Sequence, residues 1–181
     1  MRTGVRVGID VGTVRIGVSR SDFHGMLATP VETVPRQKPT RPNATAGTAA
    51  TPTAATPTAA MPAAAAADLS RIAAIIAELE AVEVIVGLPL ALSGRHTAST
   101  DDAVAFAAAL AVAVAVPVRL VDERLSTVSA QSALRTVGRS TRTQRPVVDQ
   151  VAATIILQHA LDTERASGQP AGAPVEQTGR P

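Results

Sequence analysis

Residues 5–21 read VRVGIDVGTVRIGVSRS, two β-branched runs joined by the short turn Gly12-Thr13-Val14. Such runs, bounded by glycine, predict strands over 5–10 and 15–21 that pair as a hairpin. Asp10 ends the first strand, although the burial of an unpaired carboxylate is costly. Gly8 lies two residues before it and would let another group approach the backbone closely. Asp10 is therefore either a functional ligand at the centre of a sheet or a polar cap on the turn, and the spacing leaves both open.

The rest of the chain alternates between strand and helix patterns. Strands are predicted over 27–34, 82–86 and 118–121, the first at an edge because of Pro30 and the second stopped by Gly87. Apolar residues at helical spacing predict helices over 68–81, 101–114, 126–137 and 148–165. Asp68 would cap the first of these helices, and Asp101 and Asp102 the second. The order βββ-α-β-α-β-α-α predicts an α/β fold, a mixed five-stranded sheet with helices on both faces, as in the ribonuclease-H-like (RNase H-like) arrangement.

One low-complexity segment interrupts this pattern. Residues 44–67 contain 24 uncharged residues, almost all of them Ala, Thr or Pro. Without large apolar side chains, such a segment cannot offset the entropy lost on ordering. We therefore predict one domain over 1–166 with a disordered insertion over 37–67. The tail over 167–181, rich in Gly, Pro and Gln, is predicted to be disordered too.

Composition excludes several classes of function. The 181 residues include no Cys, which excludes disulfides, thiol nucleophiles and Cys-based metal sites. They include no Trp or Tyr, so the aromatic platforms of many single-strand binders are largely excluded. The longest apolar run, over 103–118, is too short to span a membrane, and the start resembles no export signal. We therefore expect a cytoplasmic protein. Arginines are clustered without acids at Arg135, Arg139, Arg142 and Arg145, a pattern that suits phosphate binding.

Two further acidic positions accompany Asp10. Asp122 and Glu123 follow a short strand, and because side chains alternate along a strand, only one of them should face a site formed by Asp10. A solvated loop is the alternative interpretation. Asp149 lies in the first turn of the last helix, where it would also favour the helix dipole. Small or apolar residues at helical spacing after it, Ala153, Ile156 and Ala160, would let this flank lie close to the sheet.

Acids on three separate elements suit a divalent metal site. Mg²⁺ prefers carboxylate oxygens and retains several waters. Two such ions can activate water and stabilise the leaving oxygen in phosphodiester cleavage. The hypothesis depends on the convergence of the acids, since none of them is persuasive alone.

Four blocks of the sequence together resemble the YqgF/RuvX family. The opening GIDVGTVRIGVS at 8–19 is similar to the family's first block, and VGLPL at 86–90 with Ser93-Gly94 is similar to its second. DERLST at 122–127 and the pattern Asp149-x-x-Ala152-Ala153-x-x-Ile156-Leu157 resemble the third and fourth blocks, which are the specific ones. The insertion over 37–67 is a departure from the compact family pattern and lies away from every block.

This resemblance implies an RNase H-like nuclease that matures the 5′ end of precursor 16S ribosomal RNA (pre-16S rRNA). It implies Asp10, Glu123 and Asp149 as the catalytic acids and the ligands of Mg²⁺ or Mn²⁺. Thr13, Arg15, Arg95 and Arg124 would position phosphate. The expected partner is structured RNA, with branched DNA as an alternative substrate and ribosomal particles as a further partner. We expect no membrane partner and either a monomer or a homodimer.

Two other classes of function remain open at this point. Sugar kinases and actin share the Asp-x-Gly-Thr signature, but they duplicate the fold and need a second phosphate loop, which this chain lacks. A non-catalytic nucleic-acid-binding or ribosome-assembly module would keep the fold and the acids without turnover. Its affinity should fall steeply with salt if phosphate contacts dominate.

Overall fold

The computed structural model describes residues 2–37, 66–91, 93–123 and 145–176. Most of the predicted insertion, the predicted helix over 126–137 and most of the arginine cluster lie outside these residues. Within them, no helix is long and apolar enough to cross a membrane. The elements in chain order are β1 (Arg6–Val11), β2 (Arg15–Ser21), β3 (Ala28–Pro35), α1 (Ala66–Glu78), β4 (Glu83–Leu88), α2 (Ala98–Ala113), β5 (Val118–Asp122), α4 (Arg145–Ser167) and β6 (Ala173–Pro174).

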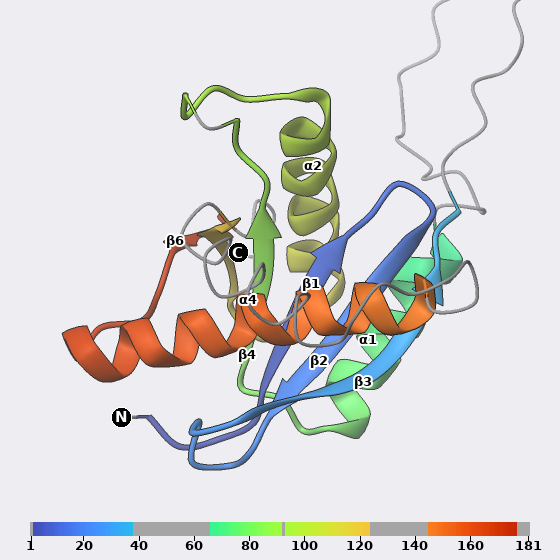
Figure 1. The fold of residues 1–181 in the computed structure, drawn as a ribbon. Coiled ribbons are helices and arrows are strands. Elements are labelled where there is room, and N and C mark those ends of the chain that lie inside the picture. The colour runs from blue at the N-terminus through green and yellow to red at the C-terminus, as the bar shows by residue number, and fades with distance from the viewer. Residues whose placement is uncertain (1, 38–65, 92, 124–144, 177–181) are drawn as a thin grey trace, which may run out of the picture.

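The strands form one mixed sheet in the order β3-β2-β1-β4-β5-β6. β1 and β2 form the predicted hairpin, with Asp10 opposite Gly17, and β3 extends it as an antiparallel edge strand. β4 lies parallel to β1 and β5 lies parallel to β4, so their carboxyl ends meet at one edge of the sheet. Helices cover both faces, as predicted: α4 crosses one face, and α1 and α2 lie on the other (Figure 1).

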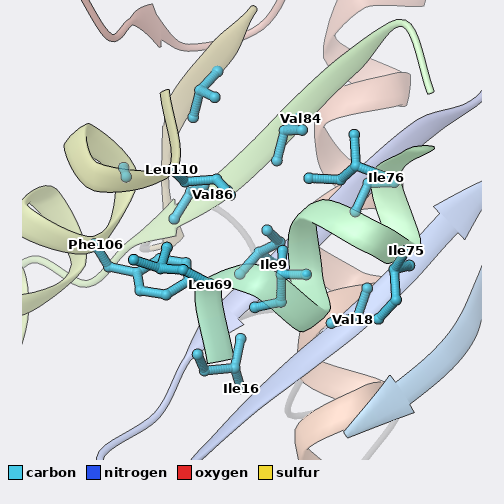
Figure 2. Close-up of a cluster of buried hydrophobic side chains, with 14 of the residues drawn as sticks. Ile9, Ile16, Val18, Leu69, Ile75, Ile76, Val84, Val86, Phe106 and Leu110 are labelled. Carbon is cyan, nitrogen blue, oxygen red and sulfur yellow. The ribbon is translucent and has the colours of Figure 1, made fainter. Parts of the chain in front are cut away.

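The larger core lies between the sheet and the pair α1 and α2. Alternate residues of the central strands face these helices, because side chains along a strand point to opposite faces. Figure 2 shows the resulting cluster, in which β-branched side chains from the strands meet Leu and Ile from α1 and Phe106 and Leu110 from α2. The second cluster lies under α4 and includes Ile85, Val121, Ile156, Leu157 and Leu161. The predicted flank of α4 is confirmed, since Ala153, Ile156 and Ala160 are all buried.

Several details differ from the sequence-based predictions. Among the described residues the sheet has six strands rather than five, because part of the tail that we expected to be disordered forms β6 at Ala173–Pro174. Its strand β6 pairs with β5, and the Arg119 side chain donates to the carbonyls of Ala171 and Gly172. β4 runs through Gly87 instead of stopping there. α2 is capped by Thr97, which forms a reciprocal capping box with Thr100, and not by Asp101 or Asp102.

Two further differences from the sequence-based predictions concern the position of Asp68 in α1 and the buried side of α4. Asp68 lies in the first turn of α1 and not at its cap, because the helix begins at Ala66. Helical spacing in the sequence also predicts a packing stripe at Val148, Val151, Ala152 and Ile155, but Val151, Ala152 and Ile155 are only half-buried, and the side chain of Val148 lies outside the described residues. The buried side of the helix is instead the flank that begins at Ala153 and continues through Leu157 and Leu161.

Candidate active site

Two of the predicted acids lie at the carboxyl ends of neighbouring parallel strands. Asp10 is near the end of β1, and Glu123 directly follows the end of β5. β4 runs between these strands, with Gly87 opposite Val121 in the register. Strand pairing thus brings together residues that are more than a hundred positions apart in the sequence.

Gly87 makes space for the carboxyl group of Glu123. A Cβ atom at Gly87 would collide with the Glu123 carboxyl oxygen Oε1 and would lie 2.7 Å from Ile156 Cδ1 of α4. Glu123 therefore lies across β4 on the face that α4 covers. Of the two adjacent acids Asp122 and Glu123, it is therefore Glu123 that lies on this face of the sheet. Val121 packs under α4, so alternation along the strand directs Asp122 to the opposite face.

Asp10 is close enough to Glu123 to influence its ionisation. Burial first, and then the negative charges of Asp10 and Asp122, together raise the pKa of Glu123 from 4.5 to about 7. A carboxyl pair that is costly to ionise in this way is stabilised by a cation placed between its members. The residues therefore fit a hard divalent ion, which prefers carboxylate oxygens and keeps part of its water shell.

The third predicted acid, Asp149, lies in the first turns of α4, one turn before Ala153. Its side chain falls outside the part of the structure that is described. Within that part, no three acidic or histidine side chains gather closely enough to hold a metal ion. Asp10 and Glu123 thus form the described portion of the candidate site.

The residues expected to position phosphate occupy two loops at the same edge of the sheet. Thr13 is exposed in the β1–β2 turn, and Arg15 is half-buried at the start of β2. Arg95 is exposed between β4 and α2, where its Nε donates to Ser93 Oγ at 3.2 Å. Arg124 lies outside the described residues. These loops follow β1 and β4, at the same edge of the sheet as Asp10 and Glu123.

Sequence analysis missed the role of Gly87, which it interpreted only as the end of a strand. The available signal was a glycine beside a continuous apolar run, because glycine inside a strand often marks a close approach of another group. The group that approaches comes from β5, and this pairing of distant segments is not visible in the sequence. Gly8 was interpreted correctly: a Cβ there would lie 2.6 Å from Leu157 Cβ and 3.0 Å from the Ala153 carbonyl oxygen of α4.

The chain is similar to known proteins along nearly its whole length. The family model described as "RuvX: Holliday junction resolvase" matches residues 43–163. A protein of Leifsonia xyli subsp. xyli named "Putative pre-16S rRNA nuclease" is 61% identical over 176 residues, which is 97% of each chain. A protein with the same name from Clavibacter michiganensis subsp. michiganensis is 57% identical over 173 residues, 96% of this chain and 92% of its own.

The similarity to the Leifsonia protein extends beyond the region that the family model matches. The aligned 97% of this chain must include most of residues 1–42, which contain Asp10. That relative has a chain of nearly the same length. The insertion over 37–67, which we expected to depart from the family pattern, therefore does not set this chain apart from it.

The fold has a counterpart among solved structures. The structure titled "T. thermophilus RuvC in complex with Holliday junction substrate" matches 95% of this chain and 99% of its own, with 18% identity and a TM-score of 0.53. This likeness concerns the fold alone and confirms the predicted RNase H-like arrangement. The family match and the close relatives together establish that the chain belongs to the RuvX family of nucleases.

Proposed function

We propose that this protein is a divalent-metal-dependent nuclease that processes the 5′ end of pre-16S rRNA in the cytoplasm. The observation that supports this most directly is that the Glu123 carboxyl group lies against Gly87, close enough to Asp10 for the charge of Asp10 to raise its pKa. The choice of RNA rests on the names of the close relatives, which are called pre-16S rRNA nucleases.

In this proposal Asp10 and Glu123, together with Asp149, hold Mg²⁺ or Mn²⁺. The bound ion would activate a water molecule and stabilise the leaving oxygen of the phosphodiester bond. The chain's own residues prepare this site in two ways. Gly87 leaves room for the Glu123 carboxyl group against β4, and the side chain of Ile156 from α4 approaches the same glycine. Thr13, Arg15, Arg95 and Arg124 orient the phosphate groups of the substrate.

The adjacent acids offer a matched test of the assignment. Glu123→Gln should lower cleavage of a 5′-extended 16S precursor in Mg²⁺ by more than about 10²-fold, because several kcal/mol of charge stabilisation is lost. Asp122→Asn removes the same charge one residue away, on the opposite face, and should retain most of the activity. Asp10→Asn should behave like Glu123→Gln. Equal loss in the Asp122 and Glu123 variants would overturn the assignment of Glu123.

Branched DNA is the second candidate substrate, because the matching family model is described as a Holliday junction resolvase. Parallel assays with a four-way DNA junction, each with Mg²⁺, Mn²⁺ or EDTA, separate the two substrates. Preferential cleavage of the junction would replace RNA with branched DNA. If neither substrate is cut while both are bound, a role as a ribosome-assembly module would be favoured over nuclease action.

A further inference from the structure

Arg36, directly after β3, has a nearly buried guanidinium group that joins two distant segments. Its Nη1 donates to the Gly12 carbonyl oxygen at 3.0 Å. Nη1 and Nη2 also donate to the two carboxylate oxygens of Asp102 in α2, at 2.6 and 2.8 Å. The side chain of Arg36 is only 8% exposed. Its guanidinium carbon lies 5.7 Å from the ring centre of Phe106, one helical turn beyond Asp102.

The segment held by Arg36 is the turn between β1 and β2. Gly12 opens that turn, two residues after Asp10. The backbone N–H of Arg36 also donates to the Val14 carbonyl oxygen at 2.8 Å. Arg36 therefore contacts the turn at both of its ends, through its side chain at Gly12 and its backbone at Val14. Thr13, between these two contacts, is exposed to solvent.

The first turns of α2 also brace the second loop of the candidate site. Thr100 is fully buried, and its Oγ1 donates to the Pro89 carbonyl oxygen just after β4. Asp102 follows two residues later and receives Arg36. The start of α2 is thus bonded directly to the loop after β4 and, through Arg36, to the β1–β2 turn. Arg36 is the connection on the β1–β2 side.

We propose that Arg36 is a positioning residue that fixes the β1–β2 turn against α2, so that Thr13 and Arg15 are already placed to receive a phosphate group of the nucleic acid. The inference rests on the proposed nuclease function. A bidentate arginine–carboxylate pair fixes geometry as well as charge, because its two parallel bonds define the plane of the guanidinium group. A turn ordered before binding loses less entropy when the substrate arrives.

The kinetic test uses Arg36→Met with Arg71→Met as its matched control. Arg71 also links β3 to a helix through an ion pair, with Glu32 at 2.6 Å, but it lies on α1 and its other ion pair is with Glu78 of the same helix. Arg36→Met should raise the KM for the 16S precursor RNA about tenfold and change kcat less than about threefold, since the acids themselves are untouched. Arg71→Met should leave both constants near those of the wild type. Arg36→Lys should raise the KM less than Arg36→Met does, because its single ammonium group can still reach part of the set of acceptors.

Amide hydrogen exchange tests the same inference without any cleavage. Arg36→Met keeps the backbone N–H that bonds to Val14, so faster exchange of that amide would report a loosened turn. The Val84 amide, which donates to the Pro117 carbonyl oxygen, should exchange at the wild-type rate. Unchanged exchange at residue 36, or an equal rise of KM in the Arg71 variant, would overturn the proposal. If no variant and no wild-type sample cuts RNA, the proposed function fails, while the exchange result still decides whether Arg36 holds the turn.

Discussion

Gly87 leaves a space on the surface of β4 that the carboxyl group of Glu123 fills. Glu123 comes from the next strand, so the site depends on the absence of a side chain between its two acids. The atoms that an added methyl group would meet are the ends of two flexible side chains, Glu123 and Ile156. Such ends can move at a small energetic cost to the fold. The proposed nuclease function, by contrast, requires the carboxyl group to remain where it is.

Gly87→Ala should therefore separate activity from stability. We expect cleavage to fall by about 10- to 100-fold, because the displaced carboxyl group no longer meets its partners in the required geometry. The free energy of unfolding should change by about 1 kcal/mol or less, since only flexible chain ends must yield. Chemical denaturation and precursor cleavage, measured on the same preparation, give the two values. Full activity in a correctly folded variant would contradict the placement of Glu123.

Sequence patterns predicted part of this site and left a definite part open. Alternation along β5 predicts that Asp122 and Glu123 face opposite sides, and Glu123 lies against Gly87. Which side faces Asp10 depends on where α4 lies, and α4 follows β5 by more than twenty residues. Arg36 was not predicted for a similar reason, because its acceptors on Gly12 and Asp102 are distant from it in sequence.

α4 lies close to β1 because Gly8 presents no side chain to it. The Ser19 hydroxyl of β2 donates to the Ala153 carbonyl oxygen of α4 at 2.9 Å, next to Gly8. Leu157 covers the same glycine from the following turn. Small residues on both elements therefore determine how near the helix comes to the sheet.

Gly8→Ala should destabilise the whole fold, unlike the substitution at Gly87. The new Cβ would meet the Leu157 Cβ and the Ala153 backbone oxygen, which belong to the rigid part of α4. The helix as a unit must then move, and overpacking of this kind costs about 1–3 kcal/mol. The denaturant midpoint should fall with an unchanged slope. A midpoint equal to that of Gly87→Ala would show that α4 is more easily displaced than its packing indicates.

Elements with strong local signals were predicted well, and those that depend on partners were not. The β1–β2 hairpin and the edge position of β3 followed from β-branched runs, glycines and Pro30. β6 has no such signal: it is only two residues long and forms because the backbone of β5 offers it partners. The cap of α2 was assigned to the nearest acids, whereas Thr97 and Thr100 satisfy each other's backbone N–H groups.

At the scale of the whole molecule, a buried charge cluster lies at the other end of the sheet from the acid pair. Arg6 at the start of β1 and Glu83 at the start of β4 are almost fully buried, as is Glu164 near the end of α4. Arg2 donates to both glutamates, at 2.8 Å each, and Arg6 donates to Glu164 at 3.1 Å. The cluster thus ties the C-terminal part of α4 to the two central strands.

These charges and the acid pair should make the stability of the metal-free protein depend on pH in opposite senses. Hydrogen bonds from Arg2 hold the pKa of Glu164 below its ordinary value of 4.5. That carboxyl group therefore contributes stability above pH 4.5, which is lost as the pH falls through its folded pKa. Burial, together with the negative charges of Asp10 and Asp122, raises the pKa of Glu123 from 4.5 to about 7. The stability that the protonated Glu123 contributes is fully present below pH 4.5 and is lost as the pH rises through about 7.

We therefore expect the free energy of unfolding in EDTA to peak near pH 5 and to decline on both sides. Urea denaturation from pH 3 to pH 8 would measure the profile. Glu123→Gln should remove the decline between pH 5 and pH 7 while leaving the acid limb, because glutamine carries no titrating proton. Arg2→Gln should lower the maximum of the profile and make the decline on its acidic side shallower, because Glu164 then loses the donor that holds its pKa low. An unchanged decline above pH 5 in Glu123→Gln would mean that a different group titrates in this range. The Glu123 carboxyl would then be less buried beside Asp10 than its position over Gly87 requires.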